Sequence, residues 1–261
     1  MKKIIALLLA VLCLAALAAC GAKTTAPVEG DTDTDTDTDA EKVMTYAEYM
    51  AAAVDDPVVI EAYVQAHQSW WDGKLTVYAQ DKDGGYFIYN MVCTEEQAAA
   101  LVPGTKIRVK GYKTEWSGEV EVADGATFEI IADAEPYIAT ATDVTALLGT
   151  DDLIKHQNEF VAFKEMKVEA STDKDGNAVA FLYNWDGSGE EGSDLYFNVS
   201  VNGATYQFTV ESYLCDKNSE TYAAVKALQI GDYVNLEGFL YWYNGVSPHI
   251  TSVVKVVEEA N

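Results

Sequence analysis

The sequence predicts a mainly β protein built from two tandem barrels. Each barrel is expected to have five strands in a Greek-key arrangement, with a helix between the third and fourth strands. Two observations predict this. One glycine-spaced strand pattern occurs twice, and each copy lies among runs rich in Val, Tyr, Phe and Trp, which favour β-strands. A pattern repeated in this way indicates one domain architecture used twice.

The repeat is clearest in the fourth strand of each copy. Residues 104–112 (GTKIRVKGY) and 231–239 (GDYVNLEGF) both read Gly-x-x-apolar-x-apolar-x-Gly-aromatic. The match extends without a gap to Gly118 and Gly245, so residue n of the first copy corresponds to residue n + 127 of the second.

In the first copy, the apolar runs and turn residues give three strands, a helix and two strands. A helical stretch at 45–53 precedes them. The expected strands are 58–71, 75–80, 86–92, 105–116 and 118–131, and the expected helix is 95–102. This is the element order of the OB-fold.

The second copy has the same order, with one additional apolar run at 178–185 that predicts an inserted strand. The expected strands are 160–171, 194–201, 204–214, 232–243 and 246–257, and the expected helix is 219–229. We therefore expect OB-fold-like domains at 45–138 and 139–261.

The first 20 residues predict a secretory signal. Lys2 and Lys3 precede an apolar stretch that is too short to span a bilayer comfortably. The stretch ends in Leu-Ala-Ala-Cys-Gly around Cys20, which resembles the lipobox of bacterial lipoproteins; the alternative is an ordinary signal peptide. The resemblance implies lipidation of Cys20, attachment to the outer face of the cell membrane and an extracytoplasmic location.

An acidic linker is expected at 21–44, because this segment contains DTDTDTDTD and no apolar group able to build a core. A solvated stalk accounts for such a charge run; binding of cations by the alternating aspartates is the alternative.

The folded copies resemble a known class of proteins. The segments TVYAQDKDGGYFIYNM and PGTKIRVKGYKTEWSGEVEV of the first copy are similar to OB-type domains of surface lipoproteins from gut-type Gram-positive (Firmicutes-like) bacteria. The segments GEEGSDLYFNVSVNGATYQFTVESYL and GFLYWYNGVSPHITSV resemble the second domain of the same lipoproteins. The resemblance implies a fold and a location, and it implies no chemistry.

The charge argues against nucleic acid as a partner. The chain has 17 Lys and Arg against 42 Asp and Glu, a net charge of −25, whereas nucleic-acid binding draws its affinity from Lys and Arg that neutralise phosphates. The one candidate contact is a basic stripe on the expected outer face of 105–116. Its residues are Lys106, Arg108, Lys110 and Lys113, and alternating basic residues on an outward strand face usually serve solubility and edge protection, which is the interpretation we favour.

No motif predicts catalysis, a metal or a cofactor. The three histidines are isolated, no P-loop or Gly-x-Ser-x-Gly elbow is present, and no pattern singles out a glycosidase-type carboxylate pair. We therefore expect a protein that is not an enzyme. Cys93 and Cys215 are the thiols of the folded part; they are expected either to be free and buried or to form a disulfide.

The loop between the first two strands of the first copy contains Trp70 and Trp71. Neighbouring residues of a strand point to opposite sides, so both cannot enter the core without a turn or bulge. An exposed tryptophan here would be a stacking platform for a sugar or a base; the alternative is that one is core and the other covers a barrel end.

In the fourth strand of the first copy, alternation places Ile107 and Val109 inside. A bulge at Gly111 is expected to change the parity, so that Tyr112 and Trp116 turn inward. Transferred to the second copy, the same pattern predicts a bulge at Gly238 and places Leu240 and Trp242 outside. These two either pack on the first copy or on the inserted strand, or bind a ligand. The residues then expected inside are Phe239, Tyr241 and Tyr243.

The tetrapeptide Asp-Lys-Asp-Gly occurs at 81–84 and 173–176. Neither copy has the ligand spacing of an EF-hand, and each lies between β-rich segments, so both are predicted to be turns.

These observations favour a lipid-anchored surface module that holds a glycan or a protein partner through Trp70, Trp71, Leu240 and Trp242. Single-stranded nucleic-acid binding and a structural spacer or assembly role in the envelope are the alternatives.

Overall fold

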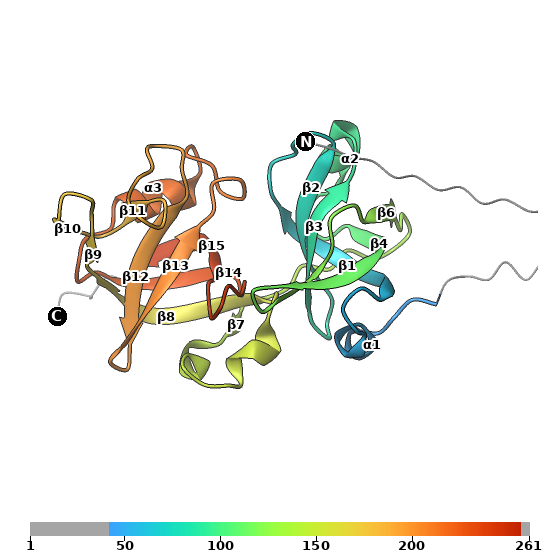
Figure 1. The fold of residues 1–261 in the computed structure, drawn as a ribbon, viewed down its shortest axis with the longest axis horizontal. Helices are drawn as coiled ribbons and strands as arrows, with labels where there is room; N and C mark the ends of the chain where they lie inside the picture. The colour runs from blue at the N-terminus through green and yellow to red at the C-terminus, as the bar shows by residue number, and fades with distance from the viewer. Residues whose placement is uncertain (1–41, 257–261) are drawn as a thin grey trace, which may run out of the picture. The chain divides into compact units, whose positions relative to one another are not determined.

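The computed structural model describes residues 42–256 (Figure 1). The predicted signal segment, the lipidation residue Cys20 and the Asp/Thr repeat lie outside the described residues. The described chain contains two closed barrels, called barrel 1 and barrel 2 below. Both have the OB-fold element order, which confirms the predicted fold class.

In barrel 1 the strands follow the order β1-β2-β3-β5-β4, and β4 pairs back on β1 to close the ring. The pairing of β3 with β5 is parallel. The predicted last strand is divided, because a separate strand, β6, pairs with the first half of β4. The elements are α1 (Tyr46–Ala51), β1 (Pro57–His67), β2 (Lys74–Gln80), β3 (Gly85–Val92), α2 (Glu95–Ala100), β4 (Lys106–Trp116), β5 (Glu119–Val122) and β6 (Thr127–Ile130).

Barrel 2 has the corresponding order β12-β13-β15-β14-β8, closed by pairing of β12 with β8. Its strands are β8 (Phe160–Glu169), β12 (Leu195–Val201), β13 (Ala204–Val210), β14 (Tyr233–Phe239) and β15 (His249–Lys255), with α3 (Glu220–Lys226) between the third and fourth. The predicted inserted strand is two short ones, β10 (Ala178–Val179), which pairs with β9 (Ser171–Thr172), and β11 (Leu182–Tyr183), which pairs with β12. The connection between the barrels carries β7 (Thr142–Asp143) and two 3-10 turns, η1 (Thr145–Leu147) and η2 (Leu153–His156).

Both inter-strand helices start at side-chain caps. Thr94 and Gln97 form a capping box at the start of α2, and Ser219 accepts from the third residue of α3. Leu101, at the end of α2, and Val225 of α3 are fully buried in the cores of barrels 1 and 2. Each helix therefore packs on the core of its own barrel.

The fourth strand of barrel 1 does not change parity at Gly111, contrary to the expectation. Its register with β1 is unbroken, so the inward side continues through Gly111 to Lys113, which is 6% exposed. Tyr112 and Trp116, expected inside, are 61% and 60% exposed. A Cβ at Gly111 would lie 2.7 Å from Cγ1 of Val122, so this glycine permits close strand packing.

The fourth strand of barrel 2 keeps its alternation as well. It runs inward through Gly238 to Leu240, which is fully buried in the barrel 2 core, so the prediction that Leu240 faces outward is wrong. The irregularity at this place lies on β15, where Thr251 is the extra residue opposite β14. Phe239, expected inside barrel 2, points away from its core.

Phe239 is buried in a small cluster between the barrels. It packs against Tyr78 of β2 and Phe87 of β3, and its ring stacks on Tyr78 with the centroids 4.5 Å apart. The end of β14 therefore docks on the β2–β3 face of barrel 1.

The segment before barrel 2 also binds barrel 1, through Gln157 and Asn158. The N–H of Val120 in β5 donates to Oε1 of Gln157 at 3.1 Å, and its carbonyl accepts from Nδ2 of Asn158 at 2.9 Å. Nε2 of Gln157 donates to the carbonyl of Gly118 at 2.8 Å. Both amide side chains are buried, and they satisfy backbone groups that no strand reaches.

Both Asp-Lys-Asp-Gly segments are turns, as predicted. Oδ1 of Asp81 accepts from the backbone N–H groups of Asp83 and Gly84, and Asp173 accepts in a similar way from its own turn. Cys93 and Cys215 are buried and free, so the structure favours the free-thiol alternative.

Candidate ligand-binding cleft

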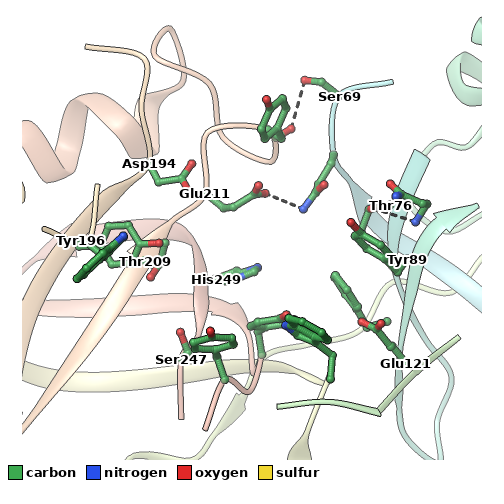
Figure 2. Close-up of a pocket in the computed structure, with 18 of the residues that line it drawn as sticks. Ser69, Thr76, Tyr89, Glu121, Asp194, Tyr196, Thr209, Glu211, Ser247 and His249 are labelled. Atoms are coloured by element: carbon green, nitrogen blue, oxygen red, sulfur yellow. Dashed lines mark hydrogen bonds between the residues drawn. The ribbon is translucent and has the colours of Figure 1, made fainter. Parts of the chain in front are cut away.

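A cleft of about 1270 Å³ lies between the two barrels (Figure 2). In an OB-fold, ligands bind on the face of strands two and three and between the loops that follow strands one and four. Both barrels contribute these parts to the same cleft, so their two ligand-binding faces line one space.

The barrel 1 wall consists of β2, β3 and the two loops beside them. Trp116 stands at the end of β4, next to the loop after the fourth strand, and Glu121 belongs to β5. The other lining residues of this wall include Gln68, Ser69, Trp71, Lys74, Thr76, Phe87 and Tyr89.

The barrel 2 wall is made in the corresponding way from β12, β13 and the segment between β14 and β15. That segment supplies Tyr241, Tyr243 and Ser247, and Trp185 comes from the insertion before β12. The other lining residues of this wall include Asp194, Tyr196, Gln207, Thr209, Glu211, Tyr213 and His249.

Aromatic rings dominate the exposed lining. Six of the lining aromatic side chains are between 42% and 74% exposed. Large exposed rings that gather in one place usually mark an interaction site. They come from both walls: Trp71, Tyr89, Trp116, Trp185, Tyr213 and Tyr243.

Hydrogen bonds cross the cleft at its rim. Nε2 of Gln68 donates to Oε2 of Glu211 at 2.8 Å (Figure 2). The carbonyl of Tyr213 accepts from the backbone N–H of Ser69 at 2.7 Å and from its hydroxyl at 3.2 Å. These bonds tie the first loop of barrel 1 to the end of β13, so this loop is held against barrel 2.

Acidic side chains outnumber basic ones among the described lining residues of the cleft. Glu121, Asp194 and Glu211 line it, whereas Lys74 is its one lysine or arginine among the described residues. Nζ of Lys74 lies 2.7 Å from a carboxylate oxygen of Asp124, which offsets its charge. Burial raises the pKa of Glu121 to about 7 and that of Glu211 to about 8.

His249 lies at the junction of the barrels. Its Nδ1 is 2.6 Å from the hydroxyl of Tyr78, and its ring stacks on Tyr241 with the centroids 4.3 Å apart. Burial lowers the pKa of His249 to about 3, so the ring is neutral and its Nδ1 can accept a hydrogen bond from the hydroxyl of Tyr78. Its role in this arrangement is to hold the barrels together.

Of the four predicted ligand-binding residues, the cleft contains Trp71. Trp70 packs on the barrel 1 core and donates its indole N–H to the carbonyl of Cys93 at 3.0 Å. Leu240 is core, and Trp242 is half-buried, with its backbone N–H donating to Glu119 of barrel 1 at 2.8 Å. Trp242 therefore follows the alternative in which it packs on the first copy.

Sequence reasoning missed Trp116, Trp185, Tyr213 and Tyr243. The wrong parity placed Trp116 and Tyr243 inside their barrels. Position in the fold could have identified Trp116 and Tyr243, because both stand beside the turn after the fourth strand, which is a ligand-binding loop of the OB-fold.

The predicted basic stripe does not form one outward face. Lys113 is buried and donates to the carbonyls of Met50 and Ala52 at 2.7 and 2.8 Å. Lys106 and Arg108 each lie 2.6 Å from a carboxylate oxygen of Glu61. The expectation that Lys113 faces outward is wrong, and the charges of Lys106 and Arg108 are offset. Lys110 is exposed and also has a partner.

Within residues 42–256, no group of three or more His, Cys, Asp or Glu side chains is arranged to hold a metal ion. In the same range, no helix is both long and apolar enough to cross a membrane.

No protein-family model and no curated protein matches the sequence. Among solved structures, a murine DNA-binding protein bound with double-stranded DNA is 12% identical over 79% of this chain and 99% of that chain, with a TM-score of 0.36. A replication protein A heterotrimer bound to single-stranded DNA is 10% identical over 83% of this chain and 69% of that chain, with a TM-score of 0.28. A single-stranded DNA binding protein from Thermus aquaticus is 11% identical over 80% and 98%, with a TM-score of 0.27. At these scores the likenesses carry no argument about what this chain binds.

Proposed function

We propose that this protein is a lipid-anchored cell-surface binding module that holds a glycan between its two barrels. The observation that carries the proposal is the convergence of both OB ligand-binding faces, with six exposed aromatic rings, on one cleft.

The chemistry of the lining supports a sugar. The C–H face of a sugar ring packs flat on an aromatic ring, whose negative face attracts it. Side chains such as Gln207 and Asp194 offer the hydrogen bonds that hydroxyl groups need. The volume exceeds the range of about 300–1,000 Å³ that is typical of drug-sized ligands, so the cleft has room for more than one sugar unit.

The anchor and the location rest on the sequence around Cys20. Lipidation there would anchor the barrels to the membrane through the acidic segment 21–44. A pure spacer or assembly subunit would leave the exposed rings of the cleft unexplained.

We also propose that the module binds without catalysis. The pKa of both Glu121 and Glu211 is raised by burial, but Glu211 is engaged by Gln68 in a contact between the barrels. A structural contact of this kind accounts for Glu211 without a reaction.

A glycan array probed with the soluble chain, followed by tryptophan fluorescence titration, tests the proposal. Trp71, Trp116 and Trp185 line the cleft, so binding should change the emission. Trp71→Ala and Trp185→Ala should each weaken binding at least about tenfold, the size of effect that a lost stacking contact of about 1.4 kcal/mol gives.

Tyr112→Ala and Tyr233→Ala are the matched controls. Both tyrosines are exposed aromatic residues on fourth strands, outside this cleft, and both variants should bind like the unchanged protein. Absence of any glycan ligand, or equal losses in cleft and control variants, would contradict the proposal.

Single-stranded nucleic acid is the second candidate, because bases also stack on exposed aromatic rings of OB faces. The charge opposes it, since the cleft has three carboxyl side chains and one lysine, itself paired. Oligonucleotide binding at low salt that weakens steeply as salt rises would favour this candidate over the glycan.

A further inference from the structure

We propose that the glycan held in the cleft carries a free, positively charged amino group, which the carboxylates of the two walls recognise. This inference rests on the proposed function and names the class of sugar that the site takes. The geometry that points to it has three parts: a carboxyl without a protein partner on one wall, further carboxyl side chains on the other, and, among the described lining residues, a single lysine that is already paired.

Glu121 is the central residue. Its side chain lines the cleft from β5 and is 7% exposed. Within residues 42–256 its side chain has no hydrogen-bond or ion-pair partner, and burial raises its pKa. Its carboxyl oxygens are not among the fully buried unpartnered atoms, so they open onto the cleft, where a ligand or water can complete their hydrogen bonds.

Two further carboxyl side chains, Asp194 and Glu211, line the cleft from barrel 2, on the wall opposite Glu121 (Figure 2). Oδ1 of Asp194 accepts from the N–H and the hydroxyl of Ser212, at 2.8 and 2.7 Å. Oε2 of Glu211 accepts from Gln68. Neutral donors orient both side chains, and within residues 42–256 neither forms an ion pair with a basic side chain.

The carboxyl groups of the cleft would therefore be ionised more readily if a cation entered from outside. Lys74 is occupied by Asp124 at 2.7 Å. An ammonium group entering the cleft beside Glu121 would stabilise the ionised form of that carboxyl, and the aromatic faces would add cation–π attraction. A sugar acid would meet repulsion in the same place.

A sugar amine fits the lining better than a lysine-rich peptide. The exposed rings are spread over both walls, from Trp71 and Trp116 to Trp185 and Tyr243. Flat stacking faces in succession suit a chain of sugar rings, whereas a lysine side chain would use the carboxylates and leave most of the rings uncovered.

The test compares oligosaccharides of equal length by calorimetry at low and moderate salt. Oligomers of glucosamine carry amines, those of N-acetylglucosamine are the neutral counterpart, and oligogalacturonate is the acidic one. We expect the amine form to bind at least tenfold more tightly than the neutral form, with an advantage that shrinks as salt rises, and the acidic form not to bind.

The outcomes separate the two proposals. Equal or tighter binding of the neutral or acidic oligomer overturns the amine inference and leaves the glycan proposal standing. If none of the three oligomers binds but a different uncharged glycan on the array does, the amine inference is likewise overturned and the glycan proposal stands. Failure of every glycan overturns both, and tighter binding of an oligolysine peptide than of the amine oligomer overturns the inference in favour of a protein partner.

Glu121→Gln removes the charge and keeps the shape. It should reduce affinity for the glucosamine oligomer about tenfold and leave affinity for the N-acetyl oligomer unchanged. Asp194→Asn is a second variant with the same expectation, should the first fail to fold. Glu115→Gln, on an exposed residue of β4 outside the cleft, is the control. Loss of both oligomers in equal measure would contradict charge recognition.

Discussion

The two barrels share one fold, but their fourth strands lie in opposite surroundings. Tyr112 of barrel 1 and Phe239 of barrel 2 are equivalent positions, and one is 61% exposed whereas the other is 3% exposed. The difference arises because the end of β14 docks on β2 and β3 of barrel 1, while the end of β4 meets no second barrel. Duplication has thus produced an asymmetric contact, in which the two copies use different surfaces.

Substitutions at this pair of positions should give the largest difference in the free energy of unfolding between the two barrels. Phe239→Ala removes a ring from the cluster with Tyr78 and Phe87 and should lower the free energy of unfolding by about 3–5 kcal/mol. Tyr112→Ala, its control, should change it by less than about 0.5 kcal/mol. Urea unfolding measures both, and similar losses in the two variants would contradict the asymmetric docking.

The position after the Ser-Gly turn gives the next largest effect. Glu119 of barrel 1 corresponds to Val246 of barrel 2, and it is fully buried, with Oε1 unpaired and Oε2 accepting from the N–H of Trp242. Burial raises its pKa to about 9, against 4.5 ordinarily. The folded state therefore holds this proton more tightly than the unfolded state, and stability is lost as pH rises between these values.

Glu119→Gln should remove that loss. The variant should gain about 3 kcal/mol relative to the unchanged protein between pH 4.5 and pH 7, and more towards pH 9, as an upper estimate from the shift. Denaturant unfolding as a function of pH measures it, with Glu115→Gln as the exposed control. A gain that is independent of pH would show that Glu119 is ionised in the folded protein.

The paired glycines differ in what surrounds them. A Cβ at Gly238 would lie 2.2 Å from the backbone oxygen of His249, whereas at Gly111 its nearest neighbour would be the side chain of Val122, at 2.7 Å. Gly238→Ala should destabilise by about 3 kcal/mol, and Gly111→Ala by about 1 kcal/mol because a side chain can move aside. Thermal unfolding of both variants should rank them in this order; the reverse ranking would contradict the packing described.

The smallest effect is expected where Lys113 corresponds to Leu240. Lys113→Leu gives barrel 1 the residue of barrel 2 and removes the donor to the carbonyls of Met50 and Ala52. The lost hydrogen bonds are partly offset by the better burial of leucine, so we expect a loss of about 1 kcal/mol. Protease resistance of the segment around α1 provides a second readout, and a variant with unchanged stability and resistance would show that these bonds contribute nothing.

Much of the fold could be predicted because it depends on local patterns. The offset between the two glycine-spaced strands identified the duplication, and Asp-Gly turns identified hairpins. The direction of side chains after Gly111 and Gly238 could not be read in this way. A glycine in a strand is compatible with a bulge and with close packing, and the neighbouring strand decides between them.

The candidate site could be predicted only in part, because only part of it depends on local sequence patterns. The loop after β1 was identified, and Trp71 lies in the cleft, but the second wall comes from residues more than a hundred positions later. Which aromatic residues face one another depends on how barrel 2 docks, and no pattern within either copy contains that information.

The amide side chains of Gln157 and Asn158 have a consequence for self-association. A strand with free backbone groups at its edge can recruit a strand from another molecule, which is a common start of aggregation. Here two side chains imitate the missing strand and occupy the N–H and C=O of Val120. The connection between the barrels thus also protects against aggregation, because it prevents strands of other molecules from pairing with the free edge of β5.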